Sequence, residues 1–145
     1  MPDNPTTRRL DQILASVDNM EELREYLSAP GTISPNSTFI AYFKSLPKVS
    51  RLGPAELYRR ANMDRSYCYH IWGGTKTPSR DKIILLCLAA GLDINETRRS
   101  LEAGQQASLY SRSQRDAVII FAIQNGLTVN ETNDLLDEIG VEILE

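Results

Sequence analysis

The chain has 145 residues, 41 % of them hydrophobic and 24 % charged, with a formal net charge of −3 at pH 7. This is the composition of an ordinary globular protein with a buried core, and it excludes a chain that is disordered throughout. No apolar run approaches the length of a membrane span and no basic-then-apolar leader is visible, so we expect a cytosolic protein without a membrane partner. Cys68 and Cys87 have no Cys or His at metal-ligand spacing, which predicts buried, reduced thiols and no metal site.

The charges are unevenly distributed along the chain. Between Tyr42 and Lys82 there are nine Lys or Arg residues against three acids, a balance of +6, so the remainder must carry −9 to give −3. Such asymmetry is typical of a basic binding face on an otherwise acidic molecule. The plainer interpretation is a solvated surface with scattered charges.

The first predicted elements form an N-terminal arm. Four apolar residues recur there at the spacing of one helix face: Leu10, Ile13, Leu14 and Val17. Asp18 or Asn19 can cap a following short helix, Met20 to Leu27, which Ala29-Pro30-Gly31 ends. Residues 1–37 are therefore predicted to be a helical arm and loop that packs on the main domain or on a partner.

Residues 38–104 are predicted to be the main helical domain. The apolar residues of the first helix lie between Phe39 and Leu46, and this helix is expected to end near Pro47. Leu52-Gly53-Pro54 opens the second helix, because proline is favoured in a first turn, where its missing N–H costs nothing.

Three further helices complete this domain. Asp64 is the predicted cap of a helix from Arg65 to Trp72, and Ser79 is the predicted cap of the next one, Arg80 to Ala90. The second of these is apolar nearly all round, which indicates a central, buried helix. Asn95 is expected to start the last helix, Glu96 to Ala103. Because no segment alternates with period two, the fold class is predicted to be all-α.

The chain also contains an internal repeat with an offset of 35 residues. The segment that opens with Arg80-Asp81-Lys82-Ile83-Ile84 returns as Arg115-Asp116-Ala117-Val118-Ile119, and Asn95-Glu96-Thr97 returns as Asn130-Glu131-Thr132. Each copy is a buried helix, a Gly-Leu turn and an amphipathic helix, and one copy cannot bury its apolar face alone. The shared residues argue against convergence of two ordinary hairpins, so residues 105–145 are predicted to stack on residues 80–104 in the same domain.

The pattern at Leu57–Leu101 resembles the phage-repressor-like, xenobiotic-response-element type of helix-turn-helix family. The residues that carry this resemblance are Leu52-Gly53-Pro54-Ala55-Glu56-Leu57, the turn Ala61-Asn62-Met63-Asp64, the helix Arg65 to Trp72 and the link Gly74-Thr75-Lys76-Thr77-Pro78-Ser79. A group of uncharacterised bacterial helix-turn-helix proteins is similar over roughly residues 39–145. The resemblance implies a helix-turn-helix bundle, here extended by the second hairpin and the N-terminal arm.

The family's second motif helix lies in the major groove of double-stranded DNA, so the resemblance also implies a site on this chain. The residues it places at base edges are Arg65, Ser66, Tyr67, Tyr69 and His70. The residues it offers to phosphates are Lys44, Lys48, Arg59, Lys76 and Arg80. Cys68 and Ile71 are expected to face the core. Pro54 stands where the family often has a phosphate-contacting Gln.

Two classes of function follow. The first is a non-enzymatic, sequence-specific DNA-binding regulator, expected to dimerise through the arm or through residues 105–145. The second is an adaptor that keeps the fold and holds a signalling, toxin or phage protein through Tyr67, Tyr69 and Trp72, because aromatic side chains are enriched at protein interfaces. No phosphate loop, Cys/His cluster or nucleophile–base motif is visible, so we expect no enzyme and no cofactor.

Overall fold

The computed structural model of the protein describes residue 15, residues 19–28 and residues 38–145. All regular structure in these ranges is helical, which confirms the all-α prediction. The chain divides into two compact units, residues 1–37 and residues 38–145. Within the described ranges, no helix is both long enough and apolar enough to cross a membrane.

The first unit contains helix α2, Met20–Ser28. Of the two predicted caps, Asn19 does the capping, because its Oδ1 accepts the N–H of Glu22 at 2.8 Å. The helix predicted from Leu10, Ile13, Leu14 and Val17 lies outside the described residues.

The second unit begins with α3 (Phe39–Ser45) and α4 (Pro47–Arg60). The prediction placed a break from Pro47 to Leu52, and this was wrong: these residues form the first part of α4. Pro47 occupies the favoured first-turn position after an extended Leu46, so proline starts a helix here in addition to ending the previous one. Gly53 then kinks α4 with φ 76° and ψ 169°, and Pro54 opens the second part as predicted.

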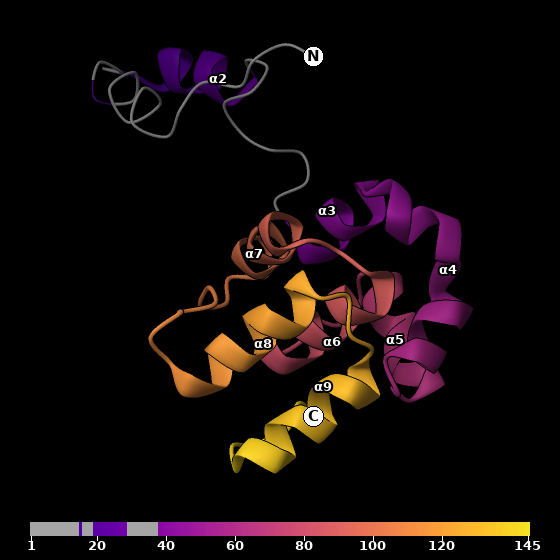
Figure 1. The fold of residues 1–145 in the computed structure, drawn as a ribbon. Helices are drawn as coiled ribbons and strands as arrows, with labels where there is room; N and C mark the ends of the chain where they lie inside the picture. Colours follow the sequence, from indigo (N-terminus) through magenta and orange to yellow (C-terminus); the bar gives the residue numbers. More distant parts are fainter. Residues whose placement is uncertain (1–14, 16–18, 29–37) are drawn as a thin grey trace. The chain divides into compact units, whose positions relative to one another are not determined.

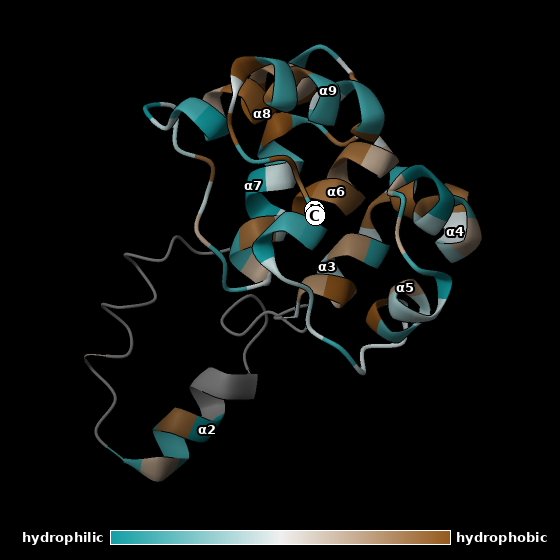
Figure 2. Cartoon of the chain, turned by 90° about the horizontal axis from the view of Figure 1, so that it is seen from below, coloured by the Kyte–Doolittle hydropathy of each residue, from teal (hydrophilic) through white to brown (hydrophobic). Residues whose placement is uncertain are grey.

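Helix α6 (Arg80–Ala90) is the centre of this unit, and every residue from Ile83 to Ala90 is buried. It contacts α4, α7 (Ile94–Ala103) and α9 (Val129–Ile139), and Figure 1 shows it between α5 (Arg65–Trp72) and α8 (Gln114–Gln124). Figure 2 shows α6 largely in brown, as a buried helix requires.

The predicted start of α7 needs a correction. Asp93, not Asn95, is the cap, since its side chain accepts the N–H of Glu96 at 2.8 Å while the Glu96 carboxylate accepts the N–H of Asp93 at 3.0 Å. This is a capping box, and Thr128 and Glu131 form the same box at the start of α9. Asn95 already lies inside the first turn.

The two copies of the repeat, α6–α7 and α8–α9, are joined by a pair of reciprocal ion pairs. Arg80 donates to Asp116 at 2.8 Å, and Arg115 donates to Asp81 at 2.8 Å. The 35-residue offset turns Arg80 into Arg115 and Asp81 into Asp116, so the same contact is made in both directions. Reciprocal contacts of this kind are the property of a twofold axis, which here relates two parts of one chain.

The hydrogen bonds around these pairs obey the same relation. Arg80 also donates to the carbonyl oxygens of residues 107 and 108, and Arg115 donates to those of residues 142 and 143. Asp116 accepts the backbone N–H of Tyr110, and Asp81 accepts that of Glu145. The approximate symmetry therefore extends beyond the helices to the segments that follow α7 and α9.

Candidate nucleic-acid interface

The candidate surface is built on α5, which follows the second part of α4 after the four residues Ala61 to Asp64. Asn62 makes the reversal with a positive φ of 55°, and Asp64 caps α5 by accepting the N–H of Tyr67 at 3.1 Å. The inner face of α5 is fixed by Cys68 and Ile71, both buried as predicted.

The outer face of α5 carries four of the five residues expected at base edges. Arg65, Ser66, Tyr69 and His70 are exposed, whereas Tyr67 is half-buried and packs against the core. Arg65 and Ser66 lie in the first turn, beside a shallow concavity lined by Asp64, Arg65, Ser66 and Tyr69. The first turn of α5 is therefore open to a ligand.

Each aromatic ring of α5 has a cation over its face. Lys76 Nζ lies 4.8 Å from the centroid of the Tyr67 ring, and Lys82 Nζ lies 5.6 Å from it. The Arg65 guanidinium carbon is 5.6 Å from the Tyr69 ring centroid, and Lys44 Nζ is 4.9 Å from the Trp72 ring. Such contacts hold long basic side chains close to the helix without neutralising their charge.

The loop that carries Lys76 is tied to the end of α5. The Thr75 hydroxyl donates to the carbonyl oxygen of His70, and its Oγ1 lies 3.1 Å from Nδ1 of the same residue. The N–H of Thr75 also donates to that carbonyl at 3.0 Å. His70 thus positions the loop and stays exposed itself.

The five residues expected at phosphates have different surroundings. Lys44 and Lys76 are exposed beside α5, but Lys48 donates to Glu96 at 2.9 Å and Arg59 is ion-paired with Glu56. Hydrogen bonds from Arg59 and then from Arg60 lower the pKa of Glu56 to about 2. Lys48 and Arg59 therefore contribute less free positive charge than Lys44 and Lys76.

Arg80 does not belong to this surface. Its guanidinium donates to Asp116 and to two carbonyl oxygens at the junction of the repeats, so its donors are already used inside the protein. The family resemblance had offered it to phosphates together with Lys76. Its partner, Asp116, is 36 residues away, and the sequence carries no signal for a contact over that separation.

Lys82 is the residue that the sequence analysis missed. It was counted in the basic segment but not assigned to the site, although it is one of two lysines over the Tyr67 ring. Its contact joins α6 to α5. The apolar pattern of one helix does not predict a contact with another.

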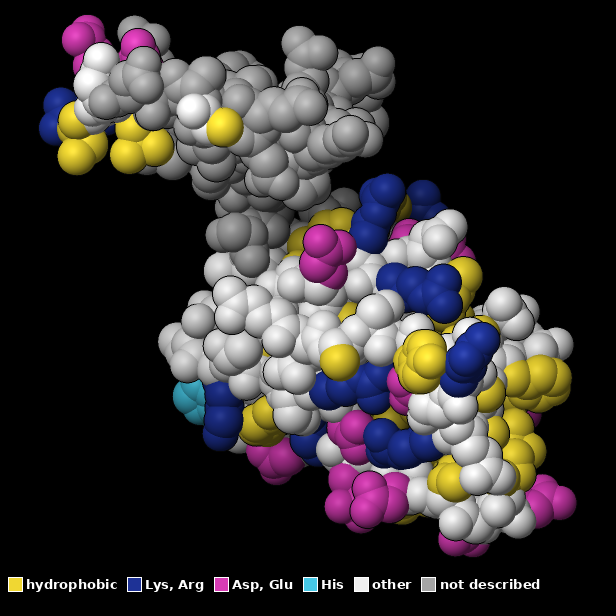
Figure 3. Space-filling model, turned by 90° about the vertical axis from the view of Figure 1, so that its left-hand side faces the viewer, with side chains coloured by type: hydrophobic (Ala, Val, Ile, Leu, Met, Phe, Trp, Pro, Cys, Tyr) yellow, Lys and Arg dark blue, Asp and Glu magenta, His cyan; other side chains and the backbone are white. Residues whose placement is uncertain are grey.

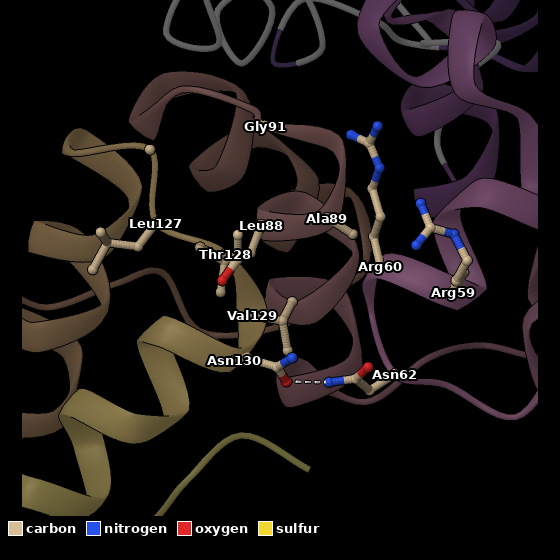
Figure 4. Close-up of a pocket in the computed structure, with 11 residues that line it drawn as sticks. Arg59, Arg60, Asn62, Leu88, Ala89, Gly91, Leu127, Thr128, Val129 and Asn130 are labelled. Carbon is tan, nitrogen blue, oxygen red and sulfur yellow. Dashed lines mark hydrogen bonds between the residues drawn. The ribbon is translucent and has the colours of Figure 1, made fainter.

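A second hollow, of about 610 Å³, lies between the end of α4, the end of α6 and the start of α9 (Figure 4). Arg59 and Arg60 extend along its α4 side, and Asn62 Nδ2 donates to Asn130 Oδ1 across one end. Both guanidinium groups are bound to Glu56, so the hollow offers little uncompensated charge.

Neither cysteine has the properties of a nucleophile. Cys68 and Cys87 are free and buried, as predicted. Burial raises the pKa of the Cys87 thiol to about 12, and it also raises the pKa of Cys68. Both therefore remain protonated at neutral pH, and thiolate chemistry requires the opposite.

Taken together, these contacts bring Lys44, Arg65, Lys76 and Lys82 around the open first turn and the aromatic rings of α5. Such a surface can bind an extended polyanion through the cations and read it through the donors of Arg65 and Ser66. No protein-family model, no curated protein and no solved structure matches this chain.

Proposed function

We propose that this protein is a non-enzymatic DNA-binding transcriptional regulator that places α5 in the major groove of double-stranded DNA. The observation that carries the proposal is the group of basic side chains around the exposed face of α5, whose first turn is open to a ligand. A helix fits the major groove, where the base edges present a distinct pattern of donors and acceptors for each base pair.

The proposed roles follow from position and exposure. Arg65 and Ser66 contact base edges, and Tyr69 and His70 lie one turn later on the same exposed face. The Arg65 guanidinium carbon lies over the Tyr69 ring, 5.6 Å from its centroid, and the N–H donors of this guanidinium are proposed to bind a guanine.

Lys44, Lys76 and Lys82 come from three different segments and are proposed to contact phosphates, which fixes the register of α5 on the duplex.

The test is selection of duplexes from a random-sequence DNA pool by the full chain, followed by affinity measurements on the selected duplex. Arg65→Ala is expected to weaken binding roughly 5- to 150-fold, the range of one bidentate arginine–guanine contact. Arg112→Ala, which removes an exposed arginine of the α7–α8 connection, is the matched control and should leave affinity unchanged. A pool that yields no enriched sequence would overturn the proposal.

A protein partner for the same face is the second candidate, and the exposed Tyr69 ring favours it. Tyr69 is 40 % exposed, and the Arg65 guanidinium carbon lies 5.6 Å from the centroid of its ring. Tyrosine and arginine are both enriched among the residues that dominate protein interfaces. An adaptor of this kind would show no shift with random DNA, and its partner binding would depend only weakly on salt.

A further inference from the structure

The second copy of the repeat carries an open apolar groove between α8 and α9. Its volume is about 390 Å³, and its lining residues are Gln114, Ala117, Val118, Phe121, Leu135 and Ile139. Phe121 is 52 % exposed and Ile139 is 41 % exposed. Figure 3 shows hydrophobic side chains and acidic side chains next to one another toward the lower right of the domain.

The first copy of the repeat contains the same groove, and there it is filled. The 35-residue offset relates Val118 to Ile83 and Phe121 to Leu86, both of which are buried. α3 covers the α7 side of this groove: a Cβ placed on Gly104, the counterpart of Ile139, would lie 3.6 Å from Cβ of Phe39, while α4 packs on α6.

The side chains of α3 that do the covering are spaced one turn apart. Phe39 and Phe43 are both buried and their rings stack at 5.0 Å. Large apolar residues at i and i+4 lie on one helix face, and this is how an amphipathic helix occupies a groove. The first repeat therefore shows what kind of element the groove between two such helices accepts.

The charge beside the groove is inverted between the two copies. In the first copy, burial raises the pKa of Tyr42 of α3, and the nearby Arg99 of α7 acts in the opposite direction. The counterpart of Arg99 in α9 is Asp134, which is exposed, and the exposed Glu138 one turn later replaces Ala103. An occupant of the second groove therefore faces an acidic margin where α3 faces a basic one.

This margin also distinguishes between occupants. A second copy of this chain, docked groove to groove, would bring two acidic margins together, and like charges held close are mutually unfavourable. A basic helix would instead neutralise the margin. Leu135 and Ile139 replace the smaller Ser100 and Gly104, so the second groove is shallower than the first.

We propose that the α8–α9 groove is a docking site for a basic amphipathic helix of another protein. The occupant carries two large apolar side chains at i and i+4, in the places that Phe39 and Phe43 take in the first copy. It carries Lys or Arg at i+3, the place of Tyr42, opposite Asp134.

The probe is a hydrocarbon-stapled peptide with the sequence of residues 38–46, in which the position of Tyr42 is lysine. A staple is needed because so short a helix is not stable alone in water. Titrated into the full chain, the peptide is expected to give saturable NMR shifts at the amides of residues 117–121 and 134–139. Phe121→Ser should weaken its binding at least tenfold, while Tyr110→Ser, which removes an exposed ring outside the groove, should not.

The contact between Asp134 and the lysine of the peptide is tested by exchanging the two charges. Asp134→Arg should weaken the lysine peptide at least fivefold, and a peptide with glutamate at the same position should bind that variant more tightly than the wild type. Glu102→Arg, the reversal of an exposed acid on α7, is the control and should change neither affinity. The proposal is overturned if no shift saturates, if the charge exchange has no effect, or if sedimentation shows a dimer of this chain that Phe121→Ser dissociates.

Discussion

At the scale of single residues, the ion pairs that join the two repeats are the contacts with the largest expected effect on stability. Asp116 has only 8 % of its side chain exposed and accepts two hydrogen bonds from Arg80. Arg80→Gln leaves this buried carboxylate without its charge partner, so we expect the free energy of unfolding to fall by about 2–4 kcal/mol. Urea denaturation followed by circular dichroism measures this loss.

Lys48→Gln is the matched control. It also removes one ion pair, to Glu96, but 46 % of the Lys48 side chain is exposed. An exposed pair contributes about 0–1 kcal/mol, so the two variants should differ clearly. Equal losses would mean that the junction of the repeats is not held by Arg80.

The same aspartate predicts how stability depends on pH. Burial by itself would raise the pKa of Asp116, but hydrogen bonds from Arg80 and from the Tyr110 N–H outweigh it, so the pKa lies below the ordinary 3.8. Because the folded-state pKa is the lower one, this stabilisation is present above pH 3.8 and is lost as the pH falls through the folded-state value.

Asp116→Asn should therefore be less stable than the wild type at pH 7, and the difference should shrink below about pH 4. Urea midpoints at both ends of this range measure it. A difference that stays constant with pH would show that the Asp116 charge does not stabilise the fold.

Residue roles could be predicted from the sequence where the partner is local. Asp64 and Ser79 were recognised as caps because each binds an N–H only three residues away. The prediction that Asn95 is the cap was wrong. A capping box begins at Asp93, and Glu96 three residues later was the sequence signal that could have identified it. The role of Arg80 could not be predicted, since its partner is distant in the sequence.

At the scale of elements, the kink in α4 depends on one glycine. Gly53 has φ 76° and ψ 169°, a region that is essentially restricted to glycine, and a Cβ there would meet nothing within 4 Å. Gly53→Ala therefore introduces backbone strain without a clash, and we expect it to lower the free energy of unfolding by about 1–3 kcal/mol. Thermal and urea denaturation measure this change.

Gly91→Ala provides the comparison. Gly91 ends α6 with φ 67° and ψ 34°, and its Cβ would also meet nothing within 4 Å. This left-handed helical conformation costs other residues only about 1–2 kcal/mol, so Gly53→Ala should be the more damaging substitution. The opposite order would show that the kink relaxes freely.

Helix bounds were predictable where a cap and a stop both stand in the sequence. The range Arg65–Trp72 was predicted correctly between Asp64 and Gly73, and Arg80–Ala90 between Ser79 and Gly91. The first part of α4 was missed because Pro47 was interpreted only as the end of a helix. Proline is equally a first-turn residue, and the pattern around it did not decide between the two.

At the scale of the whole molecule, the repeat predicted that two hairpins pack together but not how. The offset of 35 residues is visible in the sequence, whereas the twofold exchange of Arg80, Asp81, Arg115 and Asp116 depends on the relative orientation of the two copies. The sequence also could not show that α3 covers only the first copy. That difference leaves the second groove exposed.

The distribution of charge could likewise be predicted from the sequence only in part. A basic middle in an acidic chain was visible from the residue order, and the fold gathers Lys44, Lys76 and Lys82 around the rings of α5. Which of the nine basic residues are free for a ligand was not predictable, because Arg59, Lys48 and Arg80 are bound to acids of the protein itself.

The most direct test of the proposed DNA-binding surface is the salt dependence of affinity for duplex DNA. Cations that contact phosphates release counterions, so the logarithm of the binding constant should fall steeply as the logarithm of the salt concentration rises. Lys44→Gln, Lys76→Gln and Lys82→Gln should each reduce that slope by about one, while Arg112→Gln should leave it unchanged. Absence of binding at low salt, or a slope that none of the three lysine variants alters, would contradict the account.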